Sequence, residues 1–202
     1  MSSIRETKKS RFLRADMTRM GARALCMIRR IRLASLRLLG RYRSVANYEI
    51  KKITKEKKKK QVAAELYRQL RAADRREMRA IVKERGTMAE EVYESVFRSE
   101  ECYAAYDRTG LIAVWGYVQQ DAPGRLVWCL GTDRVQEHRY AFAMESRRIL
   151  TAWAQRYKVL YNAVGAFNKR VIAWLKFCGA VFHQEIMIGG ERFIPFTIEG
   201  VD

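Results

Sequence analysis

Histidine and closely spaced cysteine pairs, the usual ligands of a structural metal, are scarce in this sequence of 202 residues. The two histidines, His138 and His183, are too few for a histidine-based metal site, and we expect His183 to be structural or exposed. The four cysteines are scattered and form no C-x-x-C pair, so the sequence predicts neither a metal site nor a disulfide framework. Scattered cysteines without a disulfide pattern are typical of a protein in a reducing compartment. The cysteines are Cys26, Cys102, Cys129 and Cys178.

Several motifs that would identify a common enzyme class are also missing. The sequence has no P-loop for nucleotide phosphates and no nucleophile elbow around a serine. No apolar run approaches the ~20 residues that a membrane-spanning helix needs. We therefore predict no catalytic residue from these motifs.

Acidic residues are rare in the first part of the chain. Residues 1–60 contain 20 Lys and Arg against 4 Asp and Glu, a net charge of +16, whereas residues 61–202 contain 20 against 18, a net charge of +2. This division predicts a basic helical arm and linker over residues 1–60, followed by one folded domain over residues 61–202. A basic arm of this kind is typical of proteins that contact nucleic acid or an anionic membrane surface.

The arm has the pattern of an amphipathic helix from Arg11 to about Tyr42, because apolar residues recur there near helical spacing. Three partners fit such a helix: DNA phosphates, anionic lipid and an apolar groove on another protein. It also resembles a mitochondrial transit peptide, which is Arg-rich and acid-poor. Aromatic residues are few, so binding to DNA would involve the backbone and not the bases. The side chains expected to contact phosphate are Arg11, Arg14, Arg19, Arg23, Arg29, Arg30, Arg32, Arg37, Arg41, Arg43, Lys57, Lys58, Lys59 and Lys60.

The remaining residues predict an α+β domain. Residues 65–85 fit either one long helix or a strand at Tyr67–Leu70 followed by a helix that Asp74 caps. Thr87 and Glu90 form a capping box that opens the next helix. Strands are expected over 102–106, 111–119, 126–130, 159–164, 180–188 and 192–198, and helices over 138–157 and from Asn168 to Gly179. Gly189-Gly190 is a strong two-residue hairpin signal.

The run N-x-x-x-I-x-x-L-K-x-x-G-A-V-F-H from Asn168 to His183 resembles one family, the GNAT-like internal virion proteins of short-tailed, T7-type phages. The closing Phe196-Thr-Ile198 is similar to that family as well. The resemblance covers residues 160–198 and extends more weakly back to about Ala73. It implies a GNAT-like mixed sheet flanked by helices, and a protein of the virion interior.

GNAT enzymes hold the pyrophosphate of acetyl-coenzyme A in a Gln/Arg-x-x-Gly-x-Gly/Ala loop at a helix N-terminus. The best register here is Gln136-Glu-His-Arg139-Tyr-Ala141, in which Arg139 replaces the glycine that lets the backbone approach the phosphates. The tyrosine that acts as general acid in many GNAT enzymes would fall at Leu175. The carboxylate that acts as their general base would fall in the strand 126–130, which reads LVWCL. Asp121 or Glu145 could supply a base through water. The resemblance therefore implies a degenerate site.

These observations predict a non-enzymatic phage internal virion protein that acts in virion assembly or DNA ejection and needs no cofactor. Its GNAT-like domain would dock on other virion core or portal proteins, and its basic arm would contact those proteins, DNA or an anionic membrane surface. We expect several copies in each virion interior, after assembly in the host cytoplasm. The alternative is a GNAT-type N-acetyltransferase that uses acetyl-coenzyme A.

Overall fold

The computed structural model describes residues 47–83 and 86–200. The predicted helix from Arg11 to Tyr42, its nine arginines and Arg43 lie outside these residues. Within them, the order is β1 (Glu49–Lys52), α2 (Glu56–Gln69), α3 (Ala72–Val82), α4 (Met88–Arg98), β2 (Glu101–Asp107), β3 (Gly110–Val118), β4 (Arg125–Gly131), η2 (Asp133–Gln136), α5 (Arg139–Tyr157), β5 (Val159–Gly165), α6 (Lys169–Phe177), β6 (Val181–Phe182), β7 (Ile186–Ile188) and β8 (Glu191–Glu199).

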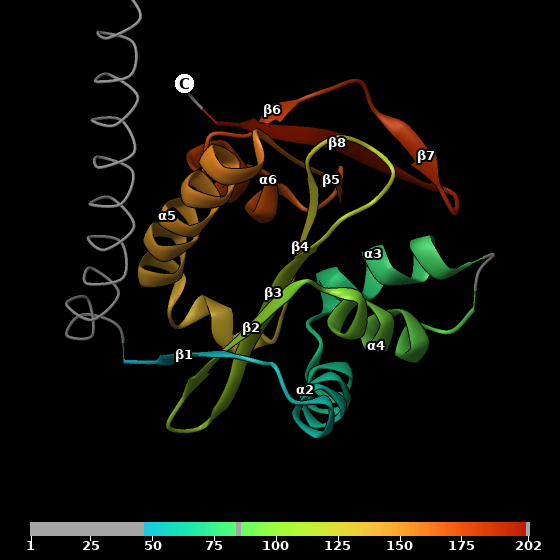
Figure 1. The fold of residues 1–202 in the computed structure, drawn as a ribbon. Coiled ribbons are helices and arrows are strands. Elements are labelled where there is room, and N and C mark those ends of the chain that lie inside the picture. The colour runs from blue at the N-terminus through green and yellow to red at the C-terminus, as the bar shows by residue number, and fades with distance from the viewer. Residues whose placement is uncertain (1–46, 84–85, 201–202) are drawn as a thin grey trace, which may run out of the picture. The chain divides into compact units, whose positions relative to one another are not determined.

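The strands form one mixed sheet (Figure 1). Its order is β1-β2-β3-β4-β5-β8-β6, and β7 pairs with the same strand, β8, as β6. All pairs are antiparallel except β4 with β5. The predicted α+β class and mixed sheet are therefore confirmed.

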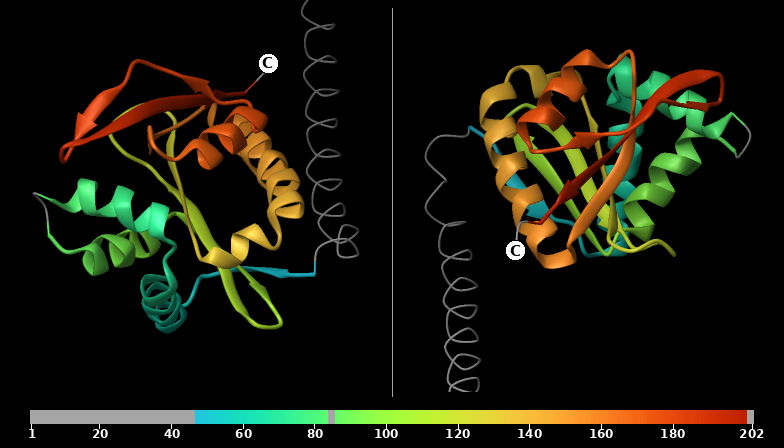
Figure 2. Two further views of the ribbon diagram at one scale, coloured as in Figure 1. Left: turned by 180° about the vertical axis from the view of Figure 1, so that it is seen from behind. Right: turned by 90° about the horizontal axis from the view of Figure 1, so that it is seen from above.

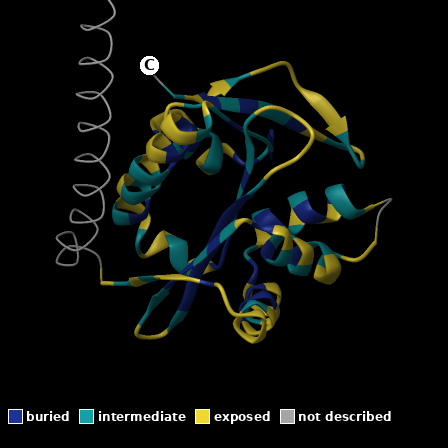
Figure 3. Ribbon diagram, viewed as in Figure 1, coloured by how far each residue is buried: buried dark blue, intermediate teal, exposed yellow. Residues whose placement is uncertain are grey.

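Helices cover both faces of this sheet (Figures 1 and 2). Helices α2 and α4 pack on one face around Val62, Leu66 and Val96, and α5 and α6 pack on the other around Trp153 and Leu175. Strand β3 lies between the two cores and is buried along almost its whole length (Figure 3). This double burial explains why its sequence is continuously apolar and does not alternate. None of the described helices is long and apolar enough to cross a membrane.

The folded unit begins earlier than predicted. It starts at Asn47, not at Gln61, so the boundary between residues 60 and 61 was wrong. Strand β1 pairs with β2 through Glu49–Lys52, and the backbone N–H of Ile53 donates to the carbonyl of Cys102 at 2.8 Å. The Ile53 side chain is buried in the core beneath α2. Lys57–Lys60 are therefore residues of a packed helix and not of a linker.

Both alternatives for residues 65–85 were also wrong. A helix, α2, runs through Tyr67, where a strand was one alternative, and a second helix, α3, starts at Ala72. Asp74 lies in the first turn of α3 and does not cap it, because Arg71 is the N-cap residue. The buried Asp74 carboxylate pairs with Arg71 at 2.8 Å and accepts from the Gly131 N–H at 2.7 Å. It therefore joins α3 to the end of β4.

Most other predicted elements are confirmed. Thr87 and Glu90 form both hydrogen bonds of the capping box. Gly179 ends α6 with a positive φ of 93°, and Gly189 and Gly190 form the predicted hairpin with φ of 54° and 86°. A Cβ at Gly189 would overlap the carbonyl of Ala80, so this turn packs closely on α3. The strand predicted over 180–188 is divided into β6 and β7, and His183 between them is exposed.

Candidate functional site

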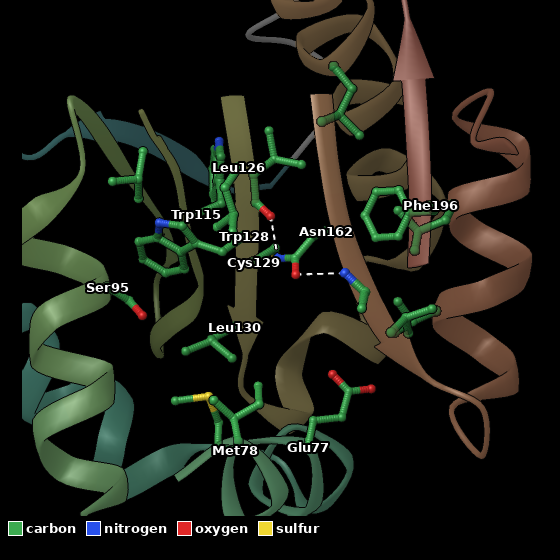
Figure 4. A pocket seen from close by; sticks show the side chains of 18 of the residues that line it. Glu77, Met78, Ser95, Trp115, Leu126, Trp128, Cys129, Leu130, Asn162 and Phe196 are labelled. Carbon is green, nitrogen blue, oxygen red and sulfur yellow. Dashed lines mark hydrogen bonds between the residues drawn. The ribbon is translucent and has the colours of Figure 1, made fainter. Parts of the chain in front are cut away.

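Strands β4 and β5 separate soon after they meet. Their parallel pairing has only two positions, Arg125 with Leu160 and Leu126 with Tyr161. Beyond these positions the Asn162 side chain reaches across and donates through Nδ2 to the carbonyl of Val127 at 2.6 Å (Figure 4). The same side chain accepts from the backbone N–H of Ala163 at 2.7 Å. Asn162 therefore links two strands that the sheet's own ladder no longer holds together.

A cavity of about 780 Å³ lies at this separation. Residues from both faces of the sheet line it, including Met78 and Ile81 from α3, Leu130 from β4 and Phe142 from α5. A cavity of this size is within the range of small-molecule sites in proteins. Its walls are mostly aliphatic and aromatic; the tryptophans among them are Trp115, Trp128, Trp153 and Trp174.

Two of these tryptophans leave their indole donors unused. The Nε1 atoms of Trp115 and Trp174 are buried and have no hydrogen-bond partner in the described structure. By contrast, the Trp128 Nε1 donates to Ser99 at 2.8 Å. Because most buried polar groups in proteins are hydrogen-bonded, these two indole N–H groups are unsatisfied donors in residues of the cavity wall.

Glu77 is a carboxylate that sequence reasoning did not identify. It points into the cavity from α3 (Figure 4), and its Oε1 accepts from Asn168 Nδ2 at 2.8 Å and from the Gly165 N–H at 3.1 Å. Burial raises its pKa above the ordinary value, while the hydrogen bond from Asn168 opposes that change. Asn168 is the N-cap residue of α6 as predicted, but its side chain makes no capping bond and binds Glu77 instead.

Acidic side chains predominate among the charged groups that line the cavity. Glu91 and Glu94 extend from α4 and Glu145 from α5, whereas Arg98 is the one basic residue among the described lining residues. Burial, together with the charge of Glu145, raises the pKa of the lining residue Tyr48 to about 12. This balance favours a neutral or cationic occupant over an anionic one.

The positions that would carry acetyl transfer hold apolar side chains. Leu175, at the expected place of the tyrosine acid, is buried and lines the cavity. Strand β4 carries no carboxylate within Leu126–Leu130. Of the two bases considered to act through water, Glu145 lines the cavity but pairs with Arg148, and Asp121 does not line it.

The three predicted loop residues do not line the cavity. Gln136 ends the short helix η2, and Arg139 and Ala141 lie in the first turn of α5. The Arg139 guanidinium is exposed and lies over the ring of its neighbour Tyr140 at 4.7 Å. The structure thus places the loop at a helix N-terminus, as expected, but directs the arginine onto an adjacent surface tyrosine.

A cluster of charged residues fixes the segment before α5. The Asp107 Oδ2 accepts from Arg134 at 2.6 Å and contacts His138 Nε2 at 2.8 Å, and Oδ1 accepts from Thr109 and Gly110. Although burial acts to raise the pKa of Asp107, hydrogen bonds from His138 and Thr109 hold it below the ordinary range. Asp107, Glu137 and His138 come close enough to share a cation. Arg134 already supplies the positive charge there, so the cluster is explained as an ion pair.

No protein-family model and no curated protein matches the sequence. Solved structures do match the fold. An Escherichia coli ribosomal-protein-S18-alanine N-acetyltransferase has a TM-score of 0.53 at 11% identity, covering 77% of this chain and 96% of that one. A Vibrio cholerae spermidine N-acetyltransferase, solved with CoA and spermine, has a TM-score of 0.51 at 13% identity, covering 76% and 95%. An N-acetyltransferase from Staphylococcus aureus Mu50 has a TM-score of 0.51 at 15% identity, covering 75% and 97%.

Identities this low show the fold alone. The likeness covers about three quarters of the chain, in keeping with the described residues. The described domain, a mixed sheet flanked by helices, has the GNAT acetyltransferase-like fold.

Proposed function

We propose that the protein is a non-enzymatic internal virion protein of a short-tailed, T7-type phage. In this proposal several copies of the GNAT-like domain dock on other core or portal proteins inside the virion. The basic N-terminal segment contacts the DNA backbone, those proteins or an anionic membrane during assembly or DNA ejection. The likeness of the run from Asn168 to His183 to that phage family is the basis for the virion role.

The replacement of the proton-transfer groups carries the non-enzymatic part of the proposal. Leu175 is buried where a tyrosine acid is expected, and the segment Leu126–Leu130 of β4 offers no base. A positioned acid or base typically contributes a 10²–10⁴-fold rate gain. Since fold does not determine activity, the proposed function is inferred from these side chains and not from the acetyltransferase-like fold.

The residues present do not fit the pyrophosphate of acetyl-coenzyme A. The loop has Arg139 where a glycine would expose the backbone, and Glu137 adds a negative charge beside that position. The cavity between β4 and β5 is lined by four glutamates and one arginine. Like charges at close range disfavour an anionic ligand. We therefore derive no catalytic step through the coenzyme.

An acetyl-transfer assay tests the non-enzymatic proposal. Release of free coenzyme thiol would be followed with acetyl-coenzyme A and a panel of polyamines, amino acids and basic peptides. We expect no rate above that of the uncatalysed reaction. Turnover at an ordinary enzymatic rate of 1–10³ s⁻¹ would contradict the proposal.

The second candidate is a GNAT-type N-acetyltransferase that uses acetyl-coenzyme A. The specific observation in its favour is Glu77, a carboxylate of raised pKa that faces the cavity. Such a group could accept a proton from an acceptor ammonium. If the assay detected turnover, Glu77→Gln should abolish most of it, while Glu199→Gln, at an exposed position of β8 outside the cavity lining, should not.

A further inference from the structure

A ridge of lysines crosses the start of the folded domain. We define the lysine ridge as the seven lysines of β1, of the following link and of the first turns of α2. They are Lys51, Lys52, Lys55, Lys57, Lys58, Lys59 and Lys60. Only two acidic residues, Glu49 and Glu56, lie in the same stretch of sequence. Strand β1 is the edge of the sheet and α2 packs on its core, so the ridge is attached to a rigid part of the fold.

Four of these lysines already have partners within the domain. Lys51, Lys52 and Lys60 form ion pairs with Glu49, Glu101 and Glu56, and Lys59 donates to the carbonyl of Phe97. The other three, Lys55, Lys57 and Lys58, are exposed and have no carboxylate within 4.0 Å among the described residues. The ridge therefore keeps three ammonium groups that the folded domain does not neutralise.

Aromatic rings hold part of the ridge in place. Lys51 and Lys58 lie over the same ring, that of Tyr106, with Nζ at 5.9 and 5.8 Å from its centroid. Lys51 comes from β1 and Lys58 from α2, so two elements bring like charges to one ring. An anion bound near this ring would reduce the repulsion between the like charges. An exposed ammonium group such as that of Lys58 can donate to a phosphate oxygen.

The surface of the ridge is charged and has no apolar anchor. The exposed large apolar residues of the described domain begin at Tyr67, beyond the ridge, and the others lie on α5, α6, β6 and β7. A peripheral membrane helix buries an apolar face between lipid headgroups, which the ridge does not offer. A nucleic-acid backbone needs only positive charge and ammonium donors. The observations thus favour nucleic acid over lipid.

We propose that the lysine ridge is a nucleic-acid phosphate-binding site on the folded domain, and that it binds without sequence preference through Lys55, Lys57 and Lys58. The sequence analysis assigned Lys57 and Lys58 to the N-terminal arm, whereas they lie on the packed helix α2 of the folded domain. The proposed site does not depend on whether the protein catalyses acetyl transfer. It would place nucleic acid along β1 and α2, on the face of the sheet opposite α5 and α6.

The test measures how DNA affinity depends on salt in the full chain. The variant Lys55→Ala/Lys57→Ala/Lys58→Ala is compared with the wild type on a short duplex of random sequence. Each phosphate contact contributes about 0.9 to the slope of log K against log salt concentration, so we expect the slope to become shallower by roughly two to three. A matched control, Lys169→Ala/Arg170→Ala/Lys176→Ala, removes three exposed positive charges from α6. It should change the slope by much less.

A second measurement does not depend on any variant. Duplex DNA added to the wild-type chain should protect Lys55, Lys57 and Lys58 from acylation by an amine-reactive reagent and leave Lys169 and Lys176 reactive. Equal slopes for the ridge variant and the wild type, or for the two triple variants, would overturn the proposal. So would protection by anionic phosphatidylserine vesicles without protection by DNA.

Discussion

At the scale of single residues, Glu77 is the group that sequence reasoning missed. It is far in sequence from the residues that it contacts and lies in a helix whose bounds were not predicted, so no local pattern identified it. Folding brings it beside Gly165 and Asn168, which are about ninety residues away. The signal available in the sequence was an acidic residue three positions after Asp74 on the same helix face, which is also a common surface pattern.

Glu77 should make folding stability depend on pH in a defined direction. Its pKa is raised in the folded state above its ordinary value of 4.5. Between these two pKa values the folded state therefore holds more protons than the unfolded state, and its stability falls as pH rises through that window. Glu77→Gln keeps an oxygen that can accept from Asn168 and Gly165 but does not ionise.

We expect the unfolding free energy of Glu77→Gln, measured with urea at a series of pH values, to fall less above pH 4.5 than that of the wild type. The control Glu94→Gln changes an exposed glutamate and should follow the wild type. If Glu77→Gln and the wild type lost stability in parallel above pH 4.5, Glu77 would not be a group whose pKa is raised by folding.

At the scale of elements, the sequence predicted the second half of the chain well and the first part poorly. The strands β2 to β5 and the helix α5 lie within two residues of their predicted bounds, because apolar runs and turn residues there agree with the final fold. Strand β1 was missed because its sequence, Glu-Ile-Lys-Lys, is mostly charged. Its place is set by pairing with β2, a contact more than fifty residues away that composition does not reveal.

The same limit applies to α2. Its mean composition is polar and lysine-rich, which resembled a linker, but Val62, Ala63 and Leu66 form a narrow buried face. The domain boundary that we predicted from the change in charge balance therefore lies too late in the sequence. The charge of a segment indicates which partners its surface can bind, whereas its few apolar positions determine whether it packs on the folded domain.

Ile53 gives a test of the corrected boundary. It lies between β1 and α2, is buried at 4% exposure, and packs in the core beneath α2. Ile53→Ala should cost about 2–5 kcal/mol of unfolding free energy, because it removes buried methylene groups and leaves a cavity. The neighbouring Thr54→Ala, at an exposed position, should change stability by less than about 0.5 kcal/mol. Equal, small effects of both substitutions in urea unfolding would restore the linker interpretation.

At the scale of the whole molecule, a GNAT-like fold is combined with different side chains at the positions where acetyl-transfer groups were expected. The sheet, the separated strands and the cavity are all present. The altered positions are Arg139 in the loop and Leu175 in the last helix, both of which could be identified from the sequence. The acidic lining of the cavity could not, because its glutamates come from α3, α4 and α5 and meet only in the folded chain.

The central proposal is that this protein does not use acetyl-coenzyme A, and calorimetric titration of the full chain with that coenzyme tests it most directly. We expect no binding at micromolar concentrations for the wild type. The variant Arg139→Gly should gain weak affinity at most, because it frees the backbone at the start of α5 but leaves Glu137 in place. Micromolar binding by the wild type that weakens in Arg139→Gly would show that the arginine holds the phosphates, and it would contradict the proposal.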